Sequence, residues 1–175
     1  MKHLYIFLEG EDDKRYFKSI IEPVLKNKYD KISYNLYRQQ KKEKIISFLK
    51  SIDKVSSWDY IFVADIDLFG NIDAKKKQLI KSYENLNMDK IVIVIKEIES
   101  WYLAGLNLDY IKKNDIMIKN NTNDIVKESF DNILKKSKLK RMSRSSWMIE
   151  IIENYNLDIA INNNDSLNYF IKLFS

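Results

Sequence analysis

Short apolar runs alternate along this chain with longer segments in which apolar residues recur at helical spacing. LYIFL (4–8), YIFVA (60–64) and KIVIVI (90–95) are nearly continuous apolar runs of strand length, a pattern typical of strands buried on both faces. KISYNLY (31–37) alternates apolar and polar residues, as a strand at the edge of a sheet does. The pattern therefore predicts about four strands.

Helical spacing fills the intervals between these runs. Residues 13–25, 42–52 and 74–86 each carry apolar residues three and four positions apart, and Pro23 is expected to bend or end the first of these helices. Strands that alternate with helices favour an α/β fold with right-handed crossovers. We expect an open, largely parallel sheet flanked by helices.

After residue 97 the pattern becomes helical throughout. The chain has 175 residues, three glycines and one proline, and no linker-like or repeated segment interrupts it. This length suits one domain of ordinary size. We therefore expect a single domain over 1–175, with the α/β core in 1–106 and a helical C-terminal extension in 107–175.

Composition narrows the chemistry. Cysteine is absent and histidine occurs once, at His3, which excludes disulfides, thiolate zinc sites and histidine-pair metal sites. No apolar run approaches the length of a membrane span and no signal peptide is recognisable, so we expect a soluble, cytoplasmic protein. The formal charge of +5 is compatible with an anionic partner.

Acidic residues gather directly after three of the apolar runs. Four acids lie within residues 9–13, Asp65 and Asp67 follow the run at 60–64, and Glu97 and Glu99 follow the run at 90–95. The carboxyl ends of parallel strands meet at one edge of a sheet, where these acids would repel one another unless a cation lay between them. Carboxylates prefer Mg²⁺, Mn²⁺ or Ca²⁺. Such a cluster predicts a divalent-metal site for phosphoryl chemistry.

Single acids in this set also have a simpler interpretation as helix caps. Asp12 and Asp13 could cap the helix that follows the first strand, and Asp73 the helix at 74–86. Asp65 and Asp67 would point to opposite sides of a continuing strand, so only a turn that begins at Asp65 brings both to one ion. Gly70 is expected to supply the freedom for that turn.

These motifs resemble the Toprim domain of topoisomerases, bacterial primases and overcoming-lysogenization-defect nucleases. The resemblance lies in Glu9-Gly10 after an apolar strand, an acid four residues later, and the DxDxxG pattern from Asp65 to Gly70. A strand that ends in an E-x-E-x-W segment, and the tail that starts at LKKSKLKR, are closer to small Toprim-like proteins of unknown function and to the nuclease branch found in phage defence. The likeness covers most of the chain.

The resemblance implies a Toprim-like sheet, a role for Glu9 as metal ligand or general base, and metal ligation by Asp65 and Asp67. It also makes Asp13 a second-metal ligand, in a position where the family usually has glutamate, and favours Glu97 over Glu99 in the segment after the fourth strand. The chain lacks room for the further apparatus of a topoisomerase or a primase. We therefore expect Mg²⁺- or Mn²⁺-dependent hydrolysis of DNA or RNA, in phage defence or DNA repair.

Basic residues are most concentrated in KKSKLKRMSRSS (135–146), which holds six cations and no acid. Such a segment is typical of sequence-independent phosphate binding, although a solvated helix end would have the same composition. We select Lys138, Lys140 and Arg141 as nucleic-acid contacts. A second basic run follows the strand at 31–37, and Arg38 is its expected phosphate contact.

Three other functions fit part of the pattern. A phospho-receiver domain would use Asp12, Asp13, Asp65 and Lys96, but it needs a fifth strand before its lysine. A PD-(D/E)xK nuclease would place lysine after its acids, whereas VIVIKEIE has the reverse order. A Toprim-like subunit that binds nucleotide or nucleic acid, and acts only with a partner ATPase, is the third alternative.

Overall fold

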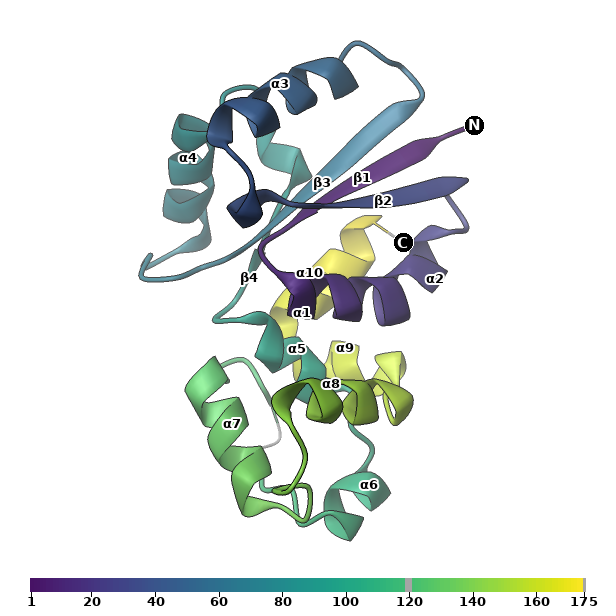
Figure 1. Ribbon diagram of the computed structural model, residues 1–175, viewed down its shortest axis with the longest axis vertical. Coiled ribbons are helices and arrows are strands. Elements are labelled where there is room, and N and C mark those ends of the chain that lie inside the picture. The colour runs from purple at the N-terminus through teal and green to yellow at the C-terminus, as the bar shows by residue number, and fades with distance from the viewer. Residues whose placement is uncertain (119–120, 175) are drawn as a thin grey trace. The chain divides into compact units, whose positions relative to one another are not determined.

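The structure is a computed structural model that describes residues 1–118 and 121–174. These residues form two compact units, Met1–Val94 and Ile95–Phe174. The first unit holds the whole sheet, and in the described residues the second consists of helices and their connections (Figure 1). The predicted boundary after residue 106 lies beyond this division, because helix α5 (Ile98–Ala104) belongs to the second unit.

Four parallel strands form the sheet of the first unit, in the order β2-β1-β3-β4. The prediction of an α/β fold with an open, parallel sheet flanked by helices is confirmed. β1 and β3 are central, which agrees with their nearly continuous apolar sequence, and β2, with its alternating sequence, is at one edge. The strands are β1 (His3–Leu8), β2 (Lys31–Leu36), β3 (Trp58–Asp65) and β4 (Ile91–Val94).

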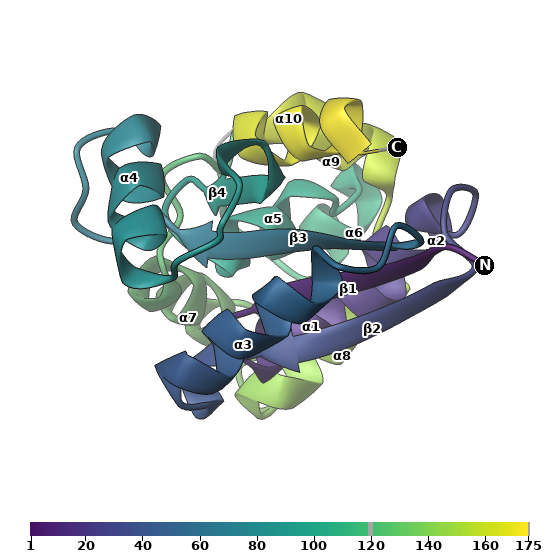
Figure 2. The same cartoon turned by 90° about the horizontal axis from the view of Figure 1, so that it is seen from above.

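Helices cover both faces of this sheet. Figure 1 shows α3 and α4 over one face and α1 and α2 over the other, and Figure 2, viewed from above, shows α3 in front of the strands and α4 to their left. The helical elements of this unit are α1 (Glu11–Tyr16), the π-helix η1 (Phe17–Ile21), α2 (Glu22–Leu25), the 3₁₀ turn η2 (Tyr37–Gln39), α3 (Lys42–Ile52), α4 (Ile72–Ser82) and the 3₁₀ turn η3 (Met88–Lys90).

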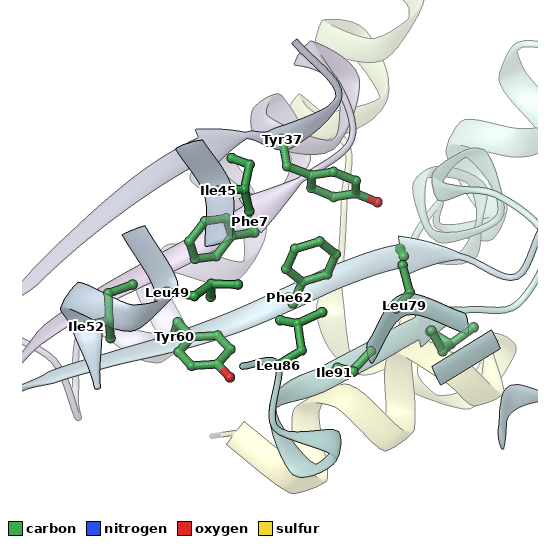
Figure 3. Packing of buried hydrophobic residues seen from close by; sticks show 12 residues of the cluster. Phe7, Tyr37, Ile45, Leu49, Ile52, Tyr60, Phe62, Leu79, Leu86 and Ile91 are labelled. Atoms are coloured by element: carbon green, nitrogen blue, oxygen red, sulfur yellow. The ribbon is translucent and has the colours of Figure 1, made fainter. Parts of the chain in front are cut away.

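The face under α3 and α4 carries an aromatic core, drawn in Figure 3. Phe62 of β3 lies at its centre, stacked on Phe7 with ring centroids 5.6 Å apart and tilted against Tyr37 at 4.4 Å. Ile45 and Leu49 of α3 are fully buried against this cluster. Burial of such side chains contributes about 1.5–3 kcal/mol each, so this face of the sheet is a rigid support for the loops at the strand ends.

Pro23 does not end the first helix. The helical backbone runs from Glu11 to Leu25, and the stretch Phe17–Ile21 immediately before the proline-containing turn is π-helical. Proline lacks an N–H and its ring crowds the carbonyl four residues earlier. The wider π-helical turn accommodates this crowding, so the predicted bend appears as a local change of helix type.

The second unit packs its helices around α5. All seven residues of α5 are buried, and α5 contacts α7, α8 and α9. No helix within 1–118 and 121–174 combines the length and apolar character of a membrane-spanning segment. The further helices of this unit are α6 (Leu108–Lys113), α7 (Lys127–Lys136), α8 (Arg144–Glu153), α9 (Leu157–Asn163) and α10 (Asp165–Phe174).

Candidate functional site

The register of the sheet brings three strand ends together. Leu8 of β1 pairs with Leu36 of β2, and Phe7 of β1 pairs with Phe62 of β3. The residue that follows β1, Glu9, therefore lies between the residue that follows β2 and the last residues of β3. This is the carboxyl edge of a parallel sheet, where side chains from neighbouring strands converge.

Glu9 is almost fully buried and is held by three donors. Its Oε1 accepts hydrogen bonds from the Tyr37 hydroxyl at 2.9 Å and from the Asp65 backbone N–H at 3.2 Å. Its Oε2 lies 2.5 Å from Nη2 of Arg38. Burial raises the pKa of Tyr37 far above its ordinary value and the charge of Glu9 raises it further, so the hydroxyl remains a donor at any physiological pH. Glu9 is consequently fixed in one orientation.

The chain turns sharply after β3 and returns Asp67 toward Glu9. Phe69 N–H donates to the Ile66 carbonyl at 3.2 Å, and Asp67 has a left-handed backbone with φ of 50°. The expectation that Gly70 provides this turn is wrong: no glycine in the described residues has positive φ. Aspartate is among the few residues with side chains that enter this region readily, so Asp67 makes the turn itself.

Two basic side chains neutralise these acids. The Lys75 ammonium, buried in the first turns of α4, forms an ion pair with Asp67. Arg38 lies 3.7 Å from Asp67 as well as contacting Glu9. Burial lowers the pKa of the Arg38 guanidinium, but the charges of Glu9, Tyr37 and Asp67 and the hydrogen bond to Glu9 together raise it above its ordinary value. The cation between the carboxylates, expected to be a metal ion, is therefore partly supplied by the protein.

A pocket of about 310 Å³ opens beside these groups. Both Glu9 and Asp67 face it, together with Arg38 and Lys75, and its remaining wall comes from the start of α3 and one face of α4. The other lining residues are Tyr37, Lys42, Gln78, Leu79, Ser82 and Tyr83. This volume and mixed charge suit a phosphate-bearing group.

Sequence reasoning did not find Lys75 and Tyr37. Lys75 lies in a run of three lysines, and only its helical phase distinguishes it: it is four residues before buried Leu79, on the face of α4 that turns inward. Tyr37 follows β2 directly and is therefore the neighbour of Glu9. Helical phase and strand register were the signals that could have identified them.

Asp13 is buried but serves the start of α1. Its Oδ2 accepts the Gly10 backbone N–H at 3.1 Å, which is the contact of a helix N-terminal cap. Asp12 forms an ion pair with Arg15 at 2.5 Å. The cap interpretation of Asp13 therefore describes its observed contact, and its assignment as a second-metal ligand stays a prediction.

Glu97 and Glu99 belong to the second unit, where each has a basic or N–H partner. The Glu97 carboxylate accepts the backbone N–H of Lys127, the first residue of α7. Glu99 is buried and pairs with Arg144, which also pairs with Asp131. The basic residues Lys138, Lys140 and Arg141 also lie in the second unit, in the loop after α7. Glu9, Asp65, Asp67 and Arg38 are the predicted site residues that the structure brings together within the first unit.

The acids of the first unit are of the chemical type that binds hard divalent cations, and metal binding by them stays a prediction. Glu9, Asp65 and Asp67 offer carboxylate oxygens, the ligands that Mg²⁺ and Mn²⁺ prefer, and a carboxylate has more lone pairs than these contacts use. Arg38 has 55% of its side chain exposed, so it can turn to solvent without disturbing the core. Within 1–118 and 121–174, no group of three or more His, Asp or Glu side chains is positioned to hold a metal ion in the present arrangement.

Comparison of the chain with models of protein families, with curated proteins and with solved structures gives no match.

Proposed function

We propose that this chain is a Toprim-like, divalent-metal-dependent phosphodiesterase that acts on nucleic acid. The observation that supports this most strongly is the cluster at the carboxyl edge of the sheet. There, the Glu9 carboxylate accepts the backbone N–H of Asp65, and Arg38 lies close to both Glu9 and Asp67. The adjacent pocket is also lined by Lys42 and Lys75. Acids for metal binding and cations for phosphate binding thus surround one space, which is the combination that phosphodiester hydrolysis requires.

Each residue of the cluster has a role in this proposal. Glu9 is a metal ligand in this proposal and is kept in orientation by the Tyr37 hydroxyl, and water is the nucleophile. Arg38 leaves Glu9 to bind the phosphate, and Lys75 holds Asp67 in place. Mg²⁺ or Mn²⁺, held by Glu9, Asp65 and Asp67, would supply Lewis-acid stabilisation of the developing charge.

The substrate in this proposal is DNA or RNA, and the biological setting is phage defence or DNA repair in the cytoplasm. The absence of cysteine suits a reducing compartment. A partner ATPase belongs to the alternative in which the chain binds nucleotide or nucleic acid and acts only together with that partner.

A second candidate is a binding module that holds nucleotide or nucleic acid without cutting it. The contacts of Arg38 and Lys75 favour this candidate, because they already neutralise Glu9 and Asp67. The receiver alternative has less support, since the described residues after β4 add no strand to the sheet.

Cleavage assays on purified protein distinguish the two candidates. We would incubate labelled DNA and RNA with Mg²⁺, Mn²⁺ or chelator, and compare the wild type with Glu9→Gln and with the double variant Asp65→Asn, Asp67→Asn. These isosteric changes remove charge and keep shape. Asp53→Asn is the matched control, because Asp53 is exposed and follows α3 within the same unit.

We expect metal-dependent cutting that Glu9→Gln and the double variant lower by at least about a hundredfold, with Asp53→Asn unchanged. Cutting that survives in the double variant would overturn the assignment of the site. Folded wild type that binds Mn²⁺ and nucleic acid, but cuts neither substrate, would favour the binding module.

A further inference from the structure

The second unit carries a basic groove that the cluster in the first unit does not use. The groove has a volume of about 410 Å³ and lies at the end of α7 and in the loop that follows it. Its lining residues are Asp115, Lys136, Ser137, Lys138, Lys140 and Arg141. Four cations thus face one concave surface with one acid.

The charge of this groove stands out against the rest of its unit. Residues 95–175 contain 12 lysines and arginines and 11 aspartates and glutamates, and six of those cations lie in residues 135–144, which contain no acid. The remainder of the unit therefore has six cations against 11 acids and is net negative. A general excess of lysine in the chain does not explain a concentration of this kind, whereas a local anionic partner does.

The backbone that presents these cations is anchored. Ser137 and Leu139 are buried, and the Leu139 carbonyl accepts the Trp147 indole N–H at 2.7 Å. The Lys138 N–H donates to the Asn114 carbonyl at 2.9 Å. Lys138, Lys140 and Arg141 are exposed, so the loop alternates between anchored and outward residues. A fixed backbone reduces the conformational entropy that binding would otherwise cost.

Most of the cations are available to a ligand. Lys136, Lys140 and Arg141 form no side-chain ion pair with any residue in 1–118 or 121–174, whereas Lys138 pairs with Asp115 at 3.2 Å. Favourable charge at the helix end accounts for Lys136, but not for Lys140 and Arg141, which lie beyond the helix.

We propose that this groove binds the phosphodiester backbone of a nucleic acid, without regard to base sequence, through Lys136, Lys138, Lys140 and Arg141. All four cations are exposed, which suits a polymer with several phosphates better than one enclosed small anion. Leu139 is buried, so the loop has no prominent apolar residue for insertion into a membrane. The choice of partner rests on the proposed function, but binding at the groove does not require cleavage.

Asp115 is a competitor within the groove. It has a left-handed backbone with φ of 52°, is exposed, and holds the Lys138 ammonium. Asparagine accepts the same backbone conformation, so Asp115→Asn removes the ion pair with Lys138 without straining the turn, while the Lys138 ammonium keeps its hydrogen bond to the Lys113 carbonyl at 2.9 Å. We expect this variant to bind nucleic acid about two- to fivefold more tightly.

The test compares two triple variants that lose the same charge. The groove variant is Lys136→Gln, Lys140→Gln, Arg141→Gln, and the surface variant is Lys28→Gln, Lys54→Gln, Lys77→Gln. All six side chains are exposed, and none forms an ion pair with a described residue. Fluorescence anisotropy of a labelled DNA duplex and of labelled RNA, with chelator present and over a range of salt concentrations, measures binding while preventing metal-dependent cleavage.

We expect the groove variant to bind nucleic acid at least about tenfold more weakly than wild type at low salt. The plot of the logarithm of the binding constant against the logarithm of the salt concentration should become less steep by roughly one unit of slope per cation removed. The surface variant should change affinity by less than about twofold. Equal affinities of the two variants would overturn the proposal, as would binding to vesicles of anionic lipid but not to nucleic acid. If the wild type does not cut nucleic acid, but the groove variant still binds more weakly than the surface variant, the proposed function is overturned and the proposed binding at the groove is not.

Discussion

Arg38 is the residue on which the candidate site depends most directly. Its guanidinium contacts Glu9 at 2.5 Å and lies 3.7 Å from Asp67, so it competes with any other cation for the same carboxylates. An ion pair of this exposure is worth about 0.2–1 kcal/mol. Removal of the guanidinium should therefore favour a metal ion at these acids.

We expect Arg38→Met to raise the affinity for Mn²⁺ by up to about fivefold, measured by calorimetric titration. Lys42→Met is the matched control, because Lys42 lines the same pocket and forms no ion pair with a described residue. It should raise Mn²⁺ affinity less. An affinity that falls or stays constant in Arg38→Met would contradict competition between the guanidinium and the metal.

The role of a residue could be predicted where its place in the sequence pattern decides that role. It could not be predicted where the role depends on a contact that forms only in the folded chain. Glu9, Asp65 and Asp67 follow apolar strands, and their place at the sheet edge follows from that pattern alone. Lys75 is different, because its role requires the turn that Asp67 makes with φ of 50°. Composition favoured Gly70 for that turn, and sequence contains no direct signal that an aspartate would adopt the left-handed conformation instead.

At the scale of elements, Gly105 couples the end of α5 to the end of α8. A Cβ at Gly105 would lie 2.4 Å from ring atoms of Tyr155, whose hydroxyl donates to the Trp101 carbonyl at 2.9 Å. The Gly105 carbonyl accepts the Asn156 N–H at 2.8 Å. Both the ring and the backbone are therefore fixed, and neither can easily move away from a methyl group.

Gly105→Ala should lower the free energy of unfolding by about 1–3 kcal/mol because it overpacks this contact. Gly70→Ala is the control: a Cβ there meets no atom within 4 Å, and we expect no loss, or a gain of about 0.4–1 kcal/mol. Urea denaturation followed by circular dichroism measures both. Equal effects of the two substitutions would show that the Tyr155 contact is not constraining.

Asp59, near the start of β3, connects this strand to η3 and to the turn before β2. It lies in β3 and accepts hydrogen bonds from the Tyr29 hydroxyl and the Lys90 ammonium, both at 2.7 Å. Burial raises the pKa of Asp59, but the hydrogen bonds from Lys90, Tyr29 and the Tyr60 backbone N–H, with the charge of Lys90, together lower it below its ordinary value. The folded state therefore binds this proton more weakly than the unfolded state does.

A lowered pKa stabilises the fold above the unfolded value of about 3.9, and the contribution is lost as pH falls through the folded value. We expect Asp59→Asn to lower unfolding free energy by about 1–2 kcal/mol at neutral pH, and the difference from wild type to shrink below about pH 4. Urea denaturation across this range tests it, with exposed Asp53→Asn as control. A difference that is independent of pH would contradict a role for the Asp59 charge.

Among the elements themselves, continuous apolar runs identified the central strands well, because burial on both faces leaves little ambiguity. The change from α- to π-helix before Pro23 was not predictable. The proline shows that one helical hydrogen bond is missing, but it does not show how the backbone adapts to this loss. The contacts of the acids that follow β4 were also not predictable from the sequence. Glu97 and Glu99 follow an apolar strand as the other acids do, yet they contact α7 and Arg144 within the second unit.

At the scale of the whole molecule, the pocket of mixed charge and the basic groove belong to different units. The first unit holds mixed charge around the pocket at Glu9, and the second holds the basic groove at Lys140 and Arg141. If the first cuts and the second binds, the two should govern different kinetic parameters. A groove contact made equally in the ground and transition states affects KM alone, whereas a group that acts in the chemical step affects kcat.

We expect the groove variant Lys136→Gln, Lys140→Gln, Arg141→Gln to raise KM for long DNA by about tenfold with kcat unchanged. Its rate on a small chromogenic phosphodiester should equal that of wild type, because such a substrate is too short to contact several cations. Glu9→Gln should instead lower kcat on both substrates. Steady-state kinetics on the two substrates separates these effects. A groove variant with reduced activity on the small substrate would mean that these cations act in the chemistry, and the division of binding and cutting between the two units would then be wrong.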